Sequence, residues 1–230
     1  MALENIVGQF SEAYDQIVPG TMLHVDELQV ARQIDPSLRK FSFHTADGII
    51  YYFCDGIPFL AITRERDNLF LQHIDDASDQ LVCTGNYRPS AEDVASALAS
   101  PNTVHINLTS LHVEGDNTEW GYLTFSPNQY DALNPEERRL AERVHGSGSA
   151  FVATMNMLRD AEIEQTRLSV LRPEYVAEQT RQGAVVRVSW LSYINYYSTY
   201  DTVHYIHGGG ILRGVPLPKA KQCREGDARN

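Results

Sequence analysis

The sequence has few cysteines, and their spacing builds neither a disulfide framework nor a metal site. Among 230 residues there are only Cys54, Cys83 and Cys223, and none of them forms a CxxC pair. Three is an odd number, so at least one thiol stays free within the chain. The sequence therefore predicts no structural zinc site and no disulfide scaffold.

Long hydrophobic runs are missing as well. The longest apolar run, residues 49–54, stops at Asp55, whereas a membrane-spanning helix needs about 20 apolar residues. The first residues, Met1-Ala2-Leu3-Glu4, lack the basic-then-apolar pattern of a secretion signal. We therefore expect a cytoplasmic protein with reduced thiols and no membrane partner.

Positive charge is scarce in the first half of the chain. Residues 1–130 hold 18 acidic and 6 basic residues, a net charge of −12, while residues 131–230 hold 12 and 13, a net charge of +1. A surface this acidic repels phosphate backbones, which argues against a nucleic-acid partner. The sequence also lacks the P-loop, the GxGxxG fingerprint and the HExxH zinc motif.

Apolar residues in the first third of the chain change their period from helical to extended. Residues 2–17 carry an apolar stripe at spacings of three and four, which predicts a helix. Residues 41–73 instead hold short β-favouring runs separated by Asp47-Gly48, Asp55-Gly56 and Asp67-Asn68. Asp-Gly between apolar runs is a strong hairpin signal, so we predict an antiparallel meander over residues 41–73.

The rest of the chain alternates helix starts with further strands. Ser90, Asn134-Pro135 and Arg172-Pro173 are typical helix beginnings, each followed by acidic residues. A strand is predicted to begin at Val104, with a bulge near Thr109-Ser110. A turn over residues 114–118 follows it, and a second strand is predicted over residues 120–125. A long strand over residues 186–196 and shorter ones over 203–206 and 211–215 complete the prediction.

Strands that mostly follow one another through short turns give an antiparallel sheet. We therefore predict an α+β fold with largely antiparallel sheets, four or five helices and a single compact domain over residues 1–230. The charge step leaves two lobes as an alternative, residues 1–130 and residues 131–230, with a polar tail over residues 216–230.

A glycine run near the end of the chain offers a candidate ligand site. Residues 203–210, which end in His207-Gly208-Gly209-Gly210, resemble the strand end and HGGG oxyanion loop of the lipase/esterase branch of the α/β-hydrolases. The chain has no GxSxG motif, and only 20 residues follow Gly210, so this family and its catalytic roles are not predicted. The bare backbone of Gly208, Gly209 and Gly210 beside Tyr205 still lets a ligand approach closely. The alternative is a tight turn between strands.

Histidines at strand ends suggest a second kind of site. His112 and Glu114 are two residues apart and share a face in a regular strand. With His207 they offer nitrogen and oxygen ligands that suit a divalent metal, the only cofactor the sequence suggests. His207 is also our candidate for a general base. Ordinary hydrogen-bonded histidines at strand ends are the alternative.

Aromatic residues crowd one short stretch of the chain. The stretch contains Trp190, Tyr193, Tyr196, Tyr197, Tyr200 and Tyr205. Tyr and Trp are enriched in interface anchors, so we expect a homo-oligomer or another protein partner to cover part of this surface. The sequence thus favours a binding or assembly subunit. The alternative is a small hydrolase or oxidoreductase that depends on histidine, with or without a metal.

Overall fold

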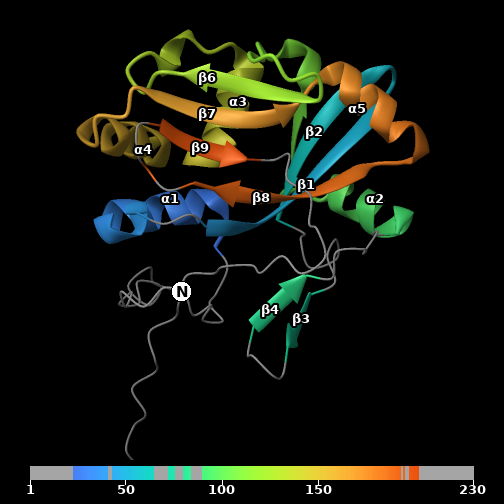
Figure 1. Cartoon of the computed structure of the whole chain (residues 1–230), viewed down its shortest axis with the longest axis horizontal. Coiled ribbons are helices and arrows are strands. Elements are labelled where there is room, and N and C mark those ends of the chain that lie inside the picture. The colour runs from blue at the N-terminus through green and yellow to red at the C-terminus, as the bar shows by residue number, and fades with distance from the viewer. Residues whose placement is uncertain are drawn as a thin grey trace, which may run out of the picture.

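Seven strands form one sheet, which the helices cover on its two faces (Figure 1). The computed structural model describes residues 23–40, 43–64, 72–75, 80–83, 90–192, 194 and 197–201. The strands are β1 (Phe43–Cys54), β2 (Ile57–Thr63), β3 (Gln72–Asp75), β4 (Gln80–Cys83), β5 (Val104–Asn107), β6 (Trp120–Phe125), β7 (Gln165–Leu171), β8 (Val185–Leu191) and β9 (Tyr197–Asp201). The α-helices are α1 (Val25–Ile34), α2 (Ala91–Ala99), α3 (Pro135–His145), α4 (Ser149–Asp160) and α5 (Pro173–Gln179).

The large sheet has the order β5-β2-β1-β8-β9-β7-β6, and only its β7–β9 pair is parallel. The strands β3 and β4 pair with each other in a separate two-stranded sheet. The predicted fold class, α+β with largely antiparallel sheets in a single compact domain, is confirmed, with five α-helices in the described part of the chain. Within those same residues, no helix has both the length and the apolar character needed to cross a membrane.

Helix starts form where the sequence predicts them. Ser90 caps α2 by accepting the backbone N–H of Asp93, and Asn134 caps α3 by accepting the N–H groups of Glu136 and Glu137. Pro173 occupies the first turn of α5, whose 3₁₀ extension ends at Gly183 with φ +124°. Side-chain caps satisfy the free N–H groups of a first turn, so these helices are set by local chemistry.

The predicted meander over residues 41–73 is confirmed in its first half. The strands β1 and β2 form a hairpin around Asp55 and Gly56, both of which have positive φ. Asp47-Gly48, however, is not a turn: both residues lie inside β1, next to a shift in its register with β8. The last apolar run of the predicted meander, residues 69–71, lies outside the described residues, and β3, which begins at Gln72, pairs with β4.

Two further expectations are corrected, and others are untested. The bulge near Thr109-Ser110 is a 3₁₀ turn over Leu108–Ser110, where the chain leaves the sheet. The strand over residues 186–196 ends at Leu191, and β9 begins at Tyr197. The helix over residues 2–17, the strands beyond residue 202 and the polar tail lie outside the described residues.

The sheet must curl, because its two outer strands are joined by a short connection. The strand β5 ends at Asn107, and Glu114 already forms a bridge with Tyr122 on β6. Seven residues span at most about 25 Å, whereas six gaps between strands of a flat sheet span about 29 Å. The connection over residues 108–119 therefore crosses from one edge of a curled sheet to the other.

Two hydrophobic clusters lie on opposite faces of the sheet. Alternate residues of β1 show the division: Ile49 and Tyr51 belong to the main core, and Ile50 belongs to a small second cluster. The helices α1, α3, α4 and α5 all contribute buried residues to the main core, while α2 contributes Ala97 to the second cluster. The described core is therefore built mainly on one face of the sheet.

Candidate functional site

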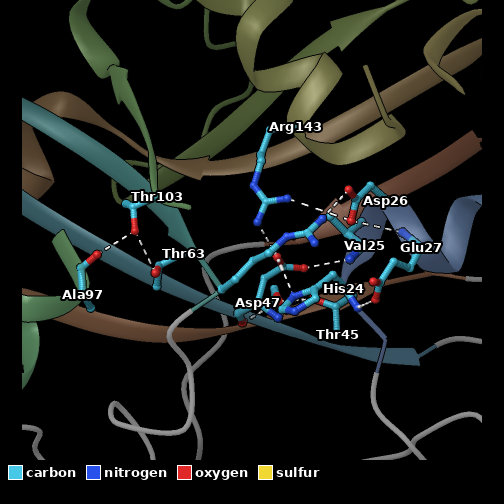
Figure 2. A network of polar contacts seen from close by, with 12 residues as sticks. His24, Val25, Asp26, Glu27, Thr45, Asp47, Thr63, Ala97, Thr103 and Arg143 are labelled. Carbon is cyan, nitrogen blue, oxygen red and sulfur yellow. Dashed lines mark hydrogen bonds and ion pairs between the residues drawn. The ribbon is translucent and has the colours of Figure 1, made fainter. Parts of the chain in front are cut away.

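The most charged part of the described interior is a cluster around Asp47, where α1, β1 and α3 meet (Figure 2). One carboxylate oxygen of Asp47 accepts the backbone N–H of Val25, at 2.8 Å, in the first turn of α1. The other accepts Arg143 of α3, at 2.8 Å, and the Nδ1–H of His24, at 3.3 Å. Asp47 thus joins the start of one helix to the side of another.

A second acid extends this cluster toward the surface. Asp26 forms an ion pair with Arg64 at 2.5 Å, and its other oxygen lies 3.9 Å from Arg143. The Asp47 side chain is fully buried and that of Arg143 is 8% exposed, while Asp26 and Arg64 are about one-third exposed. Two acids thus face two arginines, with His24 at the rim.

The surroundings keep Asp47 ionised. Burial alone would raise the pKa of this carboxyl group. The hydrogen bond from His24, the charges of Arg143 and His24 and the N–H of Val25 outweigh burial and hold the pKa below its usual value. The charge of Asp47 is therefore part of the folded structure.

Hydroxyl groups complete the cluster on the β8 side. Thr45 and Ser189 form a short hydrogen bond, and Ser189 also donates to the carbonyl oxygen of Asp47 at 3.1 Å. Burial and then the charge of Asp47 raise the pKa of Tyr200, which is fully buried on β9. The acidic oxygens are already occupied by internal donors, so this arrangement serves as a clamp between elements and not as an open catalytic centre.

Another polar group lies between α1, α3 and α4. Gln29 donates its side-chain N–H to Nδ1 of the buried His145, at 3.0 Å. Burial and the charge of Arg32 lower the pKa of His145 to about 3, so this histidine is neutral at every physiological pH. Burial and the charge of Arg39 lower the pKa of Arg32 to about 9, and Arg32 still donates to the carbonyl oxygen of Ser192 at 2.7 Å.

A different pair lies at the start of α3. His112 donates both its backbone N–H, at 3.0 Å, and its Nδ1–H, at 2.7 Å, to the same oxygen of Glu137. The Glu137 side chain is 6% exposed and that of His112 is 86% exposed. Burial raises the pKa of Glu137, but hydrogen bonds from His112 and Asn134 and the charge of His112 outweigh it and lower the pKa.

Among the predicted site residues that the structure describes, His112 has a neighbouring carboxylate that orients its ring. A carboxylate that accepts the Nδ1–H of a histidine fixes the orientation of the ring, as for many metal ligands and general bases. Glu114, the second predicted metal ligand, is exposed and exchanges two backbone hydrogen bonds with Tyr122. In the part of the chain that the structure describes, no three His, Cys, Asp or Glu side chains gather closely enough to hold a metal ion.

The other predicted site residues cannot be placed. Tyr205, His207, Gly208, Gly209 and Gly210 lie outside the described residues, so the ligand site and the general base stay predictions. The structure instead uses charged residues that the sequence analysis did not propose for a site: His24, Asp26, Asp47 and Arg143 form one cluster, and Glu137 pairs with His112. A usable signal existed only for Glu137, which lies at the third helical position of α3 in a capping box.

Comparison with known proteins identifies a fold but no family. No protein-family model and no curated protein matches the chain. One solved structure, described as "Accommodation of massive sequence variation in Nanoarchaeota by the C-type lectin fold", is similar with a TM-score of 0.50 and 10% sequence identity. The similarity covers 86% of this chain and 88% of that one. At this identity the likeness concerns the fold alone.

Proposed function

We propose that this protein is a binding or assembly subunit, built on a fold like that of C-type lectins, that works in a homo-oligomer or a complex with another protein. The observation that carries the proposal is the similarity of fold over most of both chains. The similar protein is described as accommodating massive sequence variation, which is a property of a scaffold whose surface can change while its core is kept. We propose the same division of labour here.

The internal clamps of the structure support this proposal. The charged groups around Asp47 are engaged with one another and with backbone groups, and they connect α1, β1 and α3. A scaffold for binding needs such rigid connections, since function then resides in surface residues that the core does not use. The exposed, free thiol of Cys54 fits the reducing, cytoplasmic setting that we propose.

We further propose the ligand site suggested by the sequence, where Tyr205 and Gly208–Gly210 would supply a bare backbone and His207 a ligand or base. Replacing His207 with Ala tests this site. We expect ligand or metal binding to be lost with the melting temperature unchanged. Loss of stability alone, or no effect at all, would reduce the glycine run to a turn.

The competing function, a histidine-dependent enzyme with or without a divalent metal, is favoured by one observation. His112 is oriented by Glu137 and presents its Nε2 to solvent. Two measurements on the purified chain separate the two functions: its mass in solution by light scattering, and its metal content by mass spectrometry. A stable oligomer without metal supports the binding subunit, and stoichiometric metal in a monomer supports the enzyme.

A matched pair of variants sharpens the metal measurement. If a metal is present and His112 holds it, His112→Ala lowers the metal content in proportion. His105 is the control, because its Nδ1 lies 2.9 Å from the hydroxyl of Tyr52 on another part of the sheet. His105→Ala should leave the metal content unchanged.

A further inference from the structure

The strands β2 and β5 are neighbours in the sheet although forty residues separate them in the sequence. They pair antiparallel in register, from Phe59 opposite Asn107 to Ile62 opposite Val104. Neighbouring antiparallel strands are commonly joined by a turn of two to five residues. The chain instead leaves the sheet after Thr63 and returns to the same place at Val104.

Hydrogen bonds close the base of this excursion. The hydroxyl of Thr103 lies 2.8 Å from the hydroxyl of Thr63 and 2.6 Å from the carbonyl oxygen of Ala97 in α2 (Figure 2). Thr63 and Thr103 are both buried. The two ends of the excursion are therefore bound to each other directly, and Thr103 also binds α2.

The main core draws on both ends of the hairpin that the excursion interrupts. In the described part of the chain, the buried residues of the main cluster stop at Ile62 and resume at Ile106. Among the excursion's residues whose burial the structure describes, those of α2 pack against the sheet: Ala97, Val94 and Leu98 lie over Ile50 and Ala61, on the face opposite the main core. Figure 1 shows the β3–β4 pair apart from the seven-stranded sheet.

We infer that residues 64–103 are an insertion into the β2–β5 hairpin, and that the seven-stranded sheet with its main core folds without them. This goes beyond the proposed function, because it concerns which part of the chain forms the scaffold. An insertion that the core does not use is a place where recognition can change without loss of the fold.

Two deletions test the inference. In the first variant a short Gly/Ser linker replaces residues 65–89, which keeps Arg64, α2 and the Thr63–Thr103 contact. In the second, Asn-Gly replaces residues 64–102, so that Thr63 and Thr103 are joined by a two-residue turn. Because this change uncovers Ile50, the second variant also carries Ile50→Thr. Circular dichroism and urea unfolding report on folding without any ligand.

We expect both variants to unfold cooperatively, the first within a few degrees of the intact melting temperature and the second at a lower one. Loss of cooperative unfolding in the first variant overturns the inference. If only the second fails, α2 belongs to the scaffold and the inference is wrong for residues 90–103. A control that removes residues 108–110, where the chain crosses from β5 toward β6, should abolish cooperative unfolding. These outcomes do not depend on whether the protein binds a partner.

Discussion

Two carboxylate–histidine pairs of this protein lie in opposite surroundings. In the pair of Asp47 with His24, the acid is fully buried and the histidine 20% exposed; in the pair of Glu137 with His112, the acid is 6% exposed and the histidine 86%. Both acids also accept a backbone N–H at the start of a helix, Val25 for α1 and Asn134 for α3.

The two pairs differ in how far along the chain the acid lies from the helix it caps. Glu137 belongs to the helix that it caps, so local sequence is enough to place it. Asp47 comes from a strand 22 residues after Val25 and needs Arg143, 96 residues further on, to balance its charge. We conclude that the Glu137–His112 pair stabilises one helix start, whereas the Asp47–His24 pair maintains tertiary structure.

The largest loss of stability is expected from replacing Asp47. Replacing it with Ala leaves Arg143 buried without its closest acid and the N–H of Val25 without its acceptor. Breaking a buried pair on one side costs about 3–5 kcal/mol, which urea unfolding at pH 7 measures. Glu137→Ala is the matched change in the other pair and should cost about 1–2 kcal/mol. Equal losses in the two variants would contradict the comparison.

The two pairs should also differ in how much they contribute to the loss of stability in acid. The pKa of both Asp47 and Glu137 is lowered in the folded protein. Each group therefore contributes stability that is complete above its unfolded pKa, about 4, and is lost as the pH falls through the folded value. Unfolding free energies measured between pH 7 and pH 3 should fall. Asp47→Asn should flatten this fall more than Glu137→Gln does, and an unchanged pH dependence in Asp47→Asn would argue against a role for its charge.

An intermediate loss of stability is expected from a substitution where the connection over residues 108–119 meets β6. A Cβ added to Gly121 would overlap the carbonyl oxygen of Glu114 and lie 2.5 Å from Cγ1 of Val113. Gly121→Ala should therefore cost about 1–3 kcal/mol, as overpacking does, and loosen the segment that carries His112. Hydrogen exchange at Glu114 and Tyr122 checks this. Thr124→Ala on the same strand is the control, and exchange as slow as in the parent would contradict the prediction.

The smallest effect is expected at His112. Its side chain is largely exposed, so its pairing with Glu137 is screened by water. His112→Ala should lower the unfolding free energy by less than about 1 kcal/mol, because Glu137 keeps the N–H groups of residue 112 and Asn134. A loss comparable to that of Asp47→Ala would show that exposure does not separate the two pairs.

Elements whose signals lie within a few residues were predictable from the sequence. Ser90 and Asn134 cap the helices that follow them, and Asp55-Gly56 forms the turn of the β1–β2 hairpin. In each case the donors and acceptors that decide the structure are neighbours in sequence.

Elements decided by distant contacts were not predictable in this way. Asp47-Gly48 has the composition of a turn, but β8 and β2 pair with β1 on either side of it, and Arg143 and Val25 use its carboxylate. The helix α1 was missed because its buried face carries Gln29 and Arg32, which interrupt the apolar stripe. The strand β7 was missed because its apolar residues are few, and the residues of its parallel neighbour β9 with which it pairs lie 32 positions away in sequence.

The candidate site also combines a residue chosen from local sequence with a partner that is distant in sequence. His112 was chosen for a partner two residues away, Glu114, but its ring contacts Glu137, 25 residues away. A period-two argument assumes a regular strand, and the 3₁₀ turn over Leu108–Ser110 ends that regularity just before His112. The acid that orients His112 therefore follows from tertiary structure alone.

The connection between the two outer strands has a consequence for how the protein behaves in a crowded solution. Unpaired backbone groups along an edge strand invite other chains to add to the sheet and to aggregate. Here the N–H of Asn107 on β5 donates to the carboxylate of Glu136, and Tyr122 on β6 exchanges both of its backbone hydrogen bonds with Glu114. The connection thus occupies hydrogen-bonding groups at the β6 edge and α3 does so at the end of β5, which leaves a foreign strand fewer places to attach.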